Sequence, residues 1–328
     1  MATLVTGGVG FVGASIVKQL AARGHEVVSY DVLAADALMT HFLGDLAEQV
    51  TFINGDILDT AGLDALRRAH SIDKIVHAAV FTVNRTDRET ARSKEILDIN
   101  LTGTGNLLEL AREIGVQRFV YISSGAAYGL CRDPDQTYNE DDHPQPANLY
   151  GITKLASEQL TRRYGELHGF STASLRVSTP YGPMERVTGH RDNMSTPYQW
   201  TGQMLRGEPI EIDATDYGRD YTYVVDTGAA IATVVDAPEL PHDLYNITNG
   251  VPVTGAEIQR TLAELFPETR LVEVASETVE SAGSSLGPTR GPLSGYRLWH
   301  DLGWTPQYDL AAGLTDYVRW RRESGFLD

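Results

Sequence analysis

The feature that most constrains the fold is a glycine-rich turn between a short apolar run and a helical pattern. Its sequence is Thr-Gly-Gly-Val-Gly-Phe-Val-Gly, in which the spaced glycines are Gly7, Gly10 and Gly13. The apolar run at residues 3–6 predicts a strand, and apolar residues at intervals of four predict a helix that ends near Gly24. Glycine permits a tight turn and the close approach of a pyrophosphate, whose charge meets the free N–H groups of the helix. The turn therefore predicts a dinucleotide-binding βαβ unit.

Short apolar runs alternate with helical patterns through the first half of the chain. Strands are expected at residues 3–6, 26–30, 50–53, 74–77, 119–122 and 172–176. Long amphipathic helices are expected at residues 96–114 and 150–168. After residue 176 prolines and glycines break the pattern, so a less regular region is expected to cover the carboxyl edge of the sheet. The predicted fold class is α/β, a Rossmann-type doubly wound parallel sheet with a smaller α/β substrate-binding lobe.

An acidic residue follows the second expected strand. Asp31 stands 18 residues after Gly13, near the spacing at which a carboxylate receives the hydroxyls of an adenosine ribose. Residues 32–35 are Val-Leu-Ala-Ala and offer no Arg or Lys to a 2′-phosphate. This pattern favours NAD over NADP. The alternative is an aspartate that only caps a turn.

Three polar side chains form a candidate reaction site. Tyr150 and Lys154 lie at i and i+4, on one face of an expected helix. A phenol with a pKa near 10 is a poor base at neutral pH, but an ammonium and an oxidised nicotinamide both favour the phenolate. Ser124 follows the fifth expected strand, at the sheet edge where α/β folds bind ligands. We predict that Ser124, Tyr150 and Lys154 are catalytic; the alternatives are a surface contact for the pair and a turn-capping serine.

Composition limits the partners. Asp plus Glu outnumber Lys plus Arg by 44 to 27, and the net charge of −17 argues against binding to nucleic acid or anionic membranes. Cys131 is the sole cysteine and the nine histidines show no ligand spacing, so no disulfide and no metal are expected. Neither a membrane span nor a signal peptide is expected. We predict a cytoplasmic protein with a small-molecule substrate.

The order of these motifs resembles the extended short-chain dehydrogenase/reductase superfamily, and within it the NAD-dependent epimerase/dehydratase family, over nearly the whole chain. Further matching segments are Gly55-Asp56-Ile57, His77-Ala78-Ala79, Asn100-x-x-Gly103-Thr104, Leu175-Arg176, Tyr181-Gly182-Pro183, Arg219-Asp220-Tyr221 with Asp226, Tyr245-Asn246-Ile247 and Leu302-Gly303-Trp304-x-Pro306. The resemblance implies that NAD is the cofactor, bound by Gly7, Gly10, Phe11, Val12, Gly13, Asp31, Asp56, Ile57, Ala78, Ala79, Val80, Asn100, Ser123, Tyr150 and Lys154.

The resemblance also implies roles for the reaction site and an arrangement of domains. Ser124 would bind the reacting oxygen, Tyr150 would move its proton, and Lys154 would also hold the nicotinamide ribose. An NAD-binding Rossmann domain would comprise residues 1–176 with about 213–236, and a substrate-binding lobe about 177–212 with 237–328. Many members of the family dimerise through two helices, so a homodimer through residues 90–114 and 150–168 is expected.

Within the family, the functional resemblance is strongest to the UDP-galactose/UDP-glucose 4-epimerase group. Arg219 stands where an arginine contacts the nucleotide diphosphate, although an ion pair with Asp226 is an alternative. We predict that Ser124, Thr179 and Arg219 bind the substrate. Three departures allow a different substrate: Thr179 replaces the usual asparagine, Thr82 replaces a lysine near the cofactor, and the segment at Arg290 matches loosely.

The sequence leads to a ranked set of functions. The first is an NAD-dependent epimerase that acts on a nucleotide-linked sugar by transient hydride transfer at a secondary alcohol carbon. The alternative is an NAD-dependent dehydrogenase of a small sugar, sugar acid or other secondary alcohol. A dehydratase is disfavoured because Gly125 and Ala126, not an acid/base pair, follow Ser124. A non-catalytic NAD-binding regulator is disfavoured because the complete catalytic set is present.

Overall fold

The structure of the protein is a computed structural model that describes residues 1–83, 86–130, 136–191, 193–212, 218–273 and 291–328. Cys131 and Arg290 lie outside the described residues. Within these ranges, no helix combines the length and the apolar character needed to cross a lipid bilayer.

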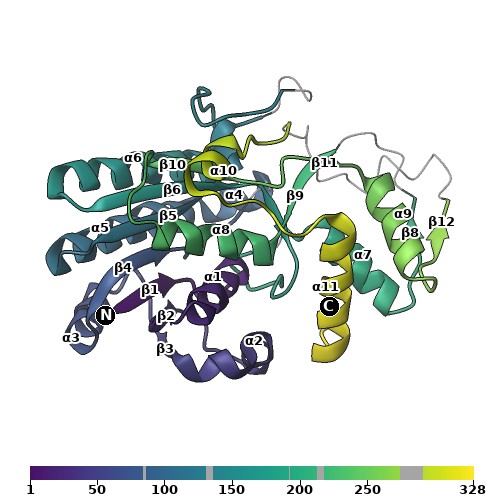
Figure 1. Cartoon of the computed structure of the whole chain (residues 1–328), viewed down its shortest axis with the longest axis horizontal. Coiled ribbons are helices and arrows are strands. Elements are labelled where there is room, and N and C mark those ends of the chain that lie inside the picture. The colour runs from purple at the N-terminus through teal and green to yellow at the C-terminus, as the bar shows by residue number, and fades with distance from the viewer. Residues whose placement is uncertain (84–85, 131–135, 192, 213–217, 274–290) are drawn as a thin grey trace.

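Among the described residues, seven parallel strands form the central sheet, in the order β10-β6-β5-β4-β1-β2-β3 (Figure 1). The strands are β1 (Ala2–Thr6), β2 (Val27–Asp31), β3 (Val50–Asn54), β4 (Ile72–His77), β5 (Arg118–Ser124), β6 (Ser171–Val177) and β10 (Leu244–Ile247). The chain builds the sheet from β1 through β2 to β3 on one side, and then from β4 through β5 and β6 to β10 on the other side. The carboxyl ends of β1 and β4 therefore form the switch point where such sheets bind ligands. The predicted α/β fold class is confirmed.

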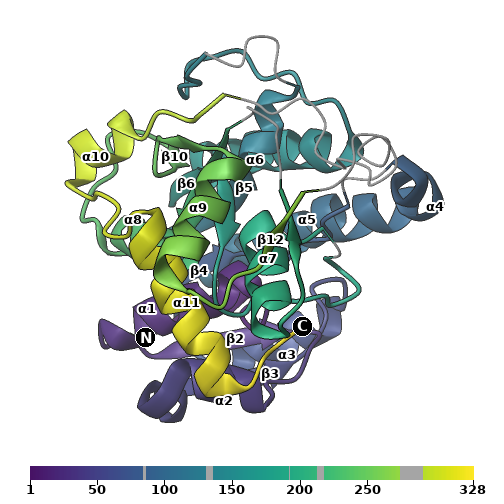
Figure 2. The ribbon, with the colours of Figure 1, turned by 90° about the vertical axis from the view of Figure 1, so that its right-hand side faces the viewer.

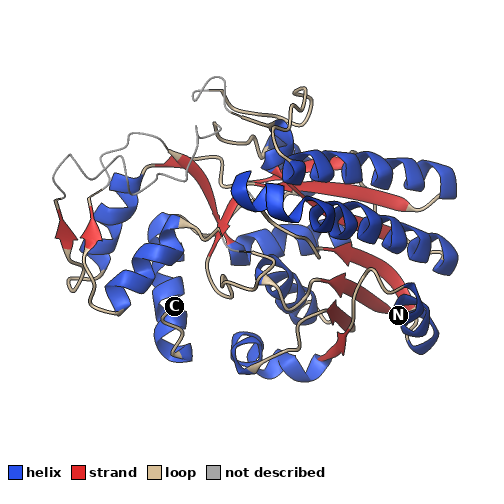
Figure 3. Cartoon of the chain, turned by 180° about the vertical axis from the view of Figure 1, so that it is seen from behind, coloured by secondary structure: helices blue, strands red, loops and turns tan. Residues whose placement is uncertain are grey.

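Alternate side chains of the strands enter two separate cores, because successive residues of a strand point to opposite faces. In β5, Val120 and Ile122 join one core, whereas Phe119 and Tyr121 join the other. The first core lies beneath α1 (Phe11–Ala22), α2 (Ala37–Leu43) and α8 (Val224–Asp236), and the second beneath α3 (Thr60–Ala69), α5 (Gly103–Ile114) and α6 (Leu149–His168). Figure 3 shows helices on both sides of the strands. The sheet is therefore apolar on both faces, as parallel sheets require.

The helix expected at residues 96–114 extends further toward the amino terminus. It consists of α4 (Thr86–Leu97), a π-helical turn at Asp98–Thr102, and α5. The helix expected at residues 150–168 is α6, and Gly24 adopts a positive φ of 82° just after α1, as predicted for its carboxyl end.

A second region lies beyond the carboxyl ends of the strands (Figures 1 and 2). It contains β7 (Thr179–Tyr181), β9 (Arg219–Tyr223) and β11 (Pro252–Val253) in one small sheet, β8 (Ile210–Glu211) paired with β12 (Leu271–Val272), and the helices α7 (Thr196–Leu205), α9 (Gly255–Leu265), α10 (Tyr296–Leu302) and α11 (Leu310–Ser324). Figure 2 shows α7, α9 and α11 in front of the central sheet.

One strand lies where the sequence does not place it. Residues 237–328 are assigned above to the substrate-binding lobe, but β10 pairs in parallel with β6 at the edge of the central sheet. The reason is the crossover through α8, which covers β5 and β6 and returns the chain to the next strand position. Leu244–Ile247 therefore belongs to the sheet of the nucleotide-binding region.

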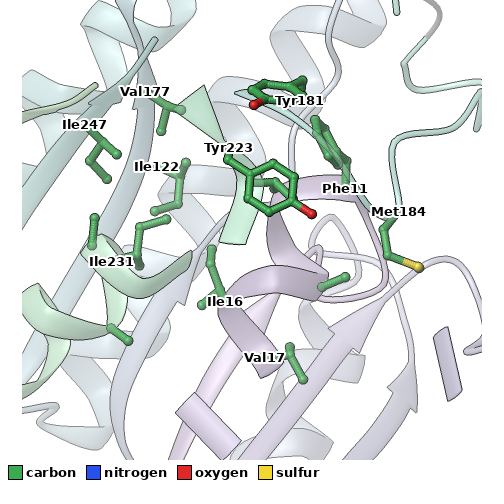
Figure 4. Close-up of a cluster of buried hydrophobic side chains, with 14 of the residues drawn as sticks. Phe11, Ile16, Val17, Ile122, Val177, Tyr181, Met184, Tyr223, Ile231 and Ile247 are labelled. Carbon is green, nitrogen blue, oxygen red and sulfur yellow. The ribbon is translucent and has the colours of Figure 1, made fainter. Parts of the chain in front are cut away.

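The two regions share one apolar core near the glycine turn. Tyr181 of β7 and Tyr223 of β9 lie with their ring centroids 5.3 Å apart and join the cluster that contains Phe11. Figure 4 shows these rings near Met184 and the side chains of α1. This packing fixes the segment that follows β6 against the first helix, and so sets the position of one side of the site.

Candidate active site

A cavity of about 410 Å³ opens at the carboxyl edge of the central sheet, where the switch point lies. The predicted site residues that line it are Gly7, Gly10, Phe11, Val12, Gly13, Asp31, Asp56, Ile57, Ala78, Ala79, Val80, Ser123, Ser124, Tyr150, Lys154, Thr179 and Arg219. The fold thus brings together the carboxyl ends of β1, β2, β4 and β5, the first turns of α6, and residues of β7 and β9 that are far apart in the sequence.

The glycine turn forms a cradle that only glycine can build. Gly7 has a φ of 69°, and a Cβ there would lie 2.6 Å from the Cα of Ala79. A Cβ at Gly13 would lie 1.9 Å from the carbonyl oxygen of Gly7. Helix α1 begins after Gly10 without a side-chain cap, so its first N–H groups face the cavity with their positive partial charge. These features fit the pyrophosphate of NAD.

Asp31 is held rigidly at the end of β2. One carboxylate oxygen accepts a hydrogen bond from the N–H of Val9 and the other from the N–H of Leu33, both at 2.9 Å. Each carboxylate oxygen can accept a second bond, so the ribose hydroxyls of NAD can still be received. The carboxylate therefore combines a turn-fixing role with the predicted ribose contact.

Lys154 is buried behind Tyr150 in the first turns of α6. Asn148 caps this helix by accepting a hydrogen bond from the N–H of Gly151 at 2.8 Å. The Lys154 Nζ donates to the carbonyl of Ile122 at 2.6 Å and lies 5.8 Å from the centre of the Tyr150 ring. Burial lowers the pKa of Lys154 to about 7, and the charge of Glu158 opposes this lowering. The ammonium is thus close to its protonation midpoint at neutral pH.

Ser124 sits where β5 passes into a short 3-10 helix at Gly125–Tyr128. Its Oγ accepts a hydrogen bond from the N–H of Ala126 at 3.1 Å, so the turn-capping role is present. This bond uses a lone pair of the oxygen, and the hydroxyl can still donate its proton to a substrate oxygen in the cavity. The two interpretations of Ser124 are compatible.

Asn100 does not line the cavity, contrary to the sequence-based expectation that it binds the cofactor. Its Oδ1 accepts from the N–H of Phe81 at 2.8 Å, and its Nδ2 donates to the carbonyl of Phe81 and to the hydroxyl of Thr153, both at 3.1 Å. These bonds use both ends of the amide. Asn100 therefore fixes the segment after Ala78–Val80 against α6 and supports the cavity from behind.

His77 is also buried behind the cavity, whereas Ala78 and Ala79 line it. The hydroxyl of Thr104 donates to the carbonyl of Asn100, so it accepts from the Nε2 of His77, at 3.0 Å. The Nδ1 then accepts from the hydroxyl of Thr6 at 2.8 Å. Burial, reinforced by the nearby charge of Lys154, lowers the pKa of His77 to about 3. The ring is a neutral structural link between β1, β4 and α5.

Arg219 and Thr179 lie on neighbouring strands at the far end of the cavity. Burial lowers the pKa of Arg219, with Tyr221 opposing it, and its Nε is buried without a hydrogen-bond partner among the described residues. The carboxylate of Asp226 accepts instead from the N–H groups of Gln307 at 3.0 Å and Tyr308 at 2.9 Å. The alternative ion pair of Arg219 with Asp226 is thus absent from the described structure. A guanidinium with an unused donor suits an anionic ligand.

The loop formed by residues 184–191, called here the 184–191 loop, adds cavity residues that the sequence does not reveal. Met184 adopts a φ of 69°, which is rare for a residue with a Cβ. Arg186 lines the cavity and pairs with Asp36, and Arg191 lies 5.0 Å from the centre of the Phe11 ring. The sequence places this loop after Tyr181-Gly182-Pro183 but gives no periodic signal for its path.

Comparisons with known proteins agree with this geometry. A family model described as "NAD dependent epimerase/dehydratase family" matches residues 3–248. UDP-glucuronate 4-epimerase 1 of Arabidopsis thaliana is 29% identical over 343 residues, which cover 98% of this chain and 76% of the relative. The dTDP-D-glucose 4,6-dehydratase of Mus musculus is 27% identical over 326 residues, which cover 98% of this chain and 88% of the relative. The structure of the Thermus thermophilus UDP-glucose 4-epimerase in complex with NAD has a TM-score of 0.80 at 27% identity and covers 98% of this chain and 99% of that one.

Proposed function

The chain belongs to the NAD-dependent epimerase/dehydratase family, and from this premise we propose that it is an epimerase of a nucleotide-linked sugar. The observation that carries the proposal is that one cavity is lined by the glycine cradle, by Ser124, Tyr150 and Lys154, and by Arg219. A sugar whose diphosphate is held by Arg219 reaches back from there toward the Tyr150 hydroxyl. The names of the three relatives given above each contain a sugar nucleotide, in which the nucleotide is UDP or dTDP.

Each catalytic residue has a separate role in the reaction at a secondary alcohol of the sugar. NAD, when bound in the cradle, supplies a hydride acceptor and donor. Tyr150 as phenolate removes the hydroxyl proton of the sugar, while the Ser124 hydroxyl donates to the same oxygen and holds it in place. Bound NAD would accept the hydride from the same carbon, which would thereby be oxidised to a ketone. The Lys154 ammonium favours the phenolate form of Tyr150, because an adjacent positive charge stabilises an anion.

Inversion then requires that the ketone turn while the nucleotide stays bound. Arg219 holds the diphosphate at a distance from the reacting carbon, so rotation about the bonds of the diphosphate presents the other face of the ketone. Tyr150 would return the proton to the oxygen when the ketone is reduced again from that face by the reduced cofactor. The net redox change is zero, and the 184–191 loop packed against Asp36 and Phe11 supports retention of the cofactor between the two transfers.

Substrate screening tests this proposal directly. The purified protein is offered UDP-, GDP- and dTDP-sugars, beginning with UDP-glucose and UDP-glucuronate, followed by free sugars and sugar acids, with and without added NAD. We expect conversion between isomers of one sugar nucleotide without accumulation of NADH. Stoichiometric NADH together with an oxidised product would reject the epimerase in favour of the dehydrogenase. A dehydrated product would instead identify a dehydratase, although Gly125 and Ala126 follow Ser124 where an acid/base pair is expected.

A further inference from the structure

A buried carboxylate stands one helical turn beyond Lys154. Glu158 is 4% exposed and lies on α6, four residues after the lysine. Its Oε1 accepts from the Nε of Arg176 at 2.9 Å and its Oε2 from the Nη2 at 2.7 Å. Burial lowers the pKa of Arg176, but the hydrogen bond and attraction of Glu158 outweigh burial and raise it. The pair is therefore ionised although both side chains are hidden from water.

Glu158 is also tied to the strand that carries the catalytic serine. The hydroxyl of Ser123 donates to its Oε1 at 2.5 Å. The carbonyl of Ile122, the preceding residue, accepts from Lys154, and Ser124 is the following one. Two successive residues at the end of β5, Ile122 through its carbonyl and Ser123 through its hydroxyl, are thus hydrogen-bonded to side chains four residues apart on α6. These bonds fix the spacing between Ser124 and Tyr150.

The titratable groups around Lys154 lie on four elements. His77 on β4 is neutral, because burial lowers its pKa to about 3. Tyr121 on β5, whose ring centre lies 4.9 Å from the Nζ, stays protonated because burial raises its pKa. Arg176 on β6 is positive and is shielded by its pairing with Glu158. On α6 itself, besides Tyr150, Glu158 contributes the negative charge that favours the ammonium.

We propose that Glu158 is a positioning residue: its carboxylate, one turn beyond Lys154 on α6, stabilises the lysine ammonium, and its bond to Ser123 holds the end of β5 against α6. This role rests on the proposed function of Lys154 and Tyr150. Without Glu158 a larger fraction of Lys154 would be neutral at pH 7, and the phenol would then lack the positive charge that favours its ionisation. A buried ion pair that served only stability would leave the protonation of Lys154 unchanged.

The protonation of Lys154 can be measured without any substrate. The chain has only four lysines, at positions 18, 74, 94 and 154, so NMR of protein labelled with ¹³C at the lysine Cε resolves each titration, with Lys154→Arg as the assignment control. We expect Lys154 to titrate near the predicted midpoint of about 7 in the native protein. Glu158→Gln should lower the midpoint by about one pH unit or more, because an opposite charge nearby is lost. Glu158→Asp, which keeps the charge, should keep the midpoint close to the native one.

Glu158→Gln leaves Arg176 buried and unpaired, which could prevent folding, so a second variant is needed. Glu158→Gln combined with Arg176→Gln removes both charges, and we expect a smaller lowering of the Lys154 midpoint than in the single variant. An unchanged midpoint in either folded variant would overturn the proposal, since the effect of Glu158 would then be limited to neutralising Arg176 or to packing.

Activity provides the functional readout once a substrate is identified. The alkaline limb of the kcat profile should move to lower pH in Glu158→Gln but not in Glu158→Asp. A loss of kcat that is equal at every pH would overturn the positioning role. The screen of sugar nucleotides tests the epimerase proposal. The NMR titration needs no substrate, so it tests the role of Glu158 separately.

Discussion

Arg186, which lines the cavity, forms an ion pair with Asp36, the residue that caps helix α2. The pair joins a loop of the substrate side to the nucleotide-binding side. The same loop is fixed at its other end, where the carbonyl of His190 accepts from the N–H of Thr82 at 2.9 Å and Arg191 lies over Phe11. The 184–191 loop thus runs from the residue that caps α2 to the segment after β4, and its residues Arg186, Thr188, His190 and Arg191 line the cavity.

We therefore expect Arg186→Gln to release NAD faster than the native protein. Asp36 is about half exposed, so the pair is worth a fraction of a kcal/mol to about 1 kcal/mol, and the release rate should rise roughly two- to fivefold. The measurement is the loss of labelled NAD after dilution into unlabelled NAD. Asp36→Asn keeps a side chain that can cap α2 and should give the same increase, while the double variant should be no faster than either single one. Additive effects would show that the two residues do not act as a pair.

Loss of the Tyr150 hydroxyl should abolish proton transfer without disturbing the fold. Tyr150→Phe is expected to lower kcat by at least about 100-fold, the usual contribution of a positioned acid/base group, while bound NAD and the unfolding temperature stay close to native values. The matched control is Tyr164→Phe on the same helix, because the Tyr164 hydroxyl donates to Glu109 at 2.7 Å, away from the cavity. Native kcat in Tyr150→Phe would remove this residue from the mechanism.

Arg219 should determine the affinity for the nucleotide part of the substrate. Arg219→Gln is expected to weaken the inhibition by UDP about 10- to 100-fold, as the loss of a charge-assisted hydrogen bond predicts, with the NAD content unchanged. Competition by UDP against the identified substrate measures this effect. Arg270→Gln is the control, since Arg270 is exposed and does not line the cavity. Equal UDP affinity in the two variants would place the diphosphate elsewhere.

His77 should make the protein sensitive to acid. Its pKa is about 3 when folded against an ordinary value of 6.5, so between these values the unfolded chain binds the additional proton. Stability therefore falls as the pH decreases from 6.5 toward 3, with a slope of up to about 1.4 kcal/mol per pH unit from this one group. His77→Asn should be less stable at pH 7 but should lose stability less steeply in acid, as measured by denaturant unfolding from pH 7 to pH 4. Parallel curves for the two proteins would contradict the assignment.

The glycine cradle should be intolerant of a single methyl group. Gly13→Ala is expected to abolish NAD binding, because its Cβ would lie 1.9 Å from the carbonyl oxygen of Gly7. Gly105→Ala on α5 is the control, since a Cβ there meets nothing within 4 Å and alanine favours a helix by about 0.5–1 kcal/mol. Calorimetric titration with NAD and thermal unfolding would separate the two variants. Native NAD affinity in Gly13→Ala would exclude this turn as the pyrophosphate site.

The parts of the site that the sequence predicts are those set by local spacing and by the edge of a parallel sheet. Gly7 to Gly13, Asp31, and Tyr150 with Lys154 each follow from a short pattern, because a strand end or one helix face places them. The position of the Asn100 side chain does not follow from such a pattern, because its amide turns toward Phe81 and Thr153, a direction that no spacing encodes.

The features that were missed depend on tertiary packing. The path of the 184–191 loop is fixed by contacts of Arg186 and Arg191 with residues more than 100 positions away, at Asp36 and Phe11. Likewise, the sequence alone indicates only that Glu158 is a polar residue of an amphipathic helix. Its hydrogen bonds with Arg176 and Ser123 are known only from the structure. A pairing of this kind is visible only when the strands and the helix are assembled.

The most direct test of the central claim follows one hydrogen atom through turnover. The protein is offered UDP-glucose, and then the other sugar nucleotides of the screen, each carrying deuterium on the sugar carbon at position 4. The proposed chemistry predicts that the epimer keeps the deuterium on that carbon and that no NADH accumulates, since the same hydride leaves and returns within one cavity. Deuterium lost to water, or deuterated NADH released together with a ketone, would contradict it.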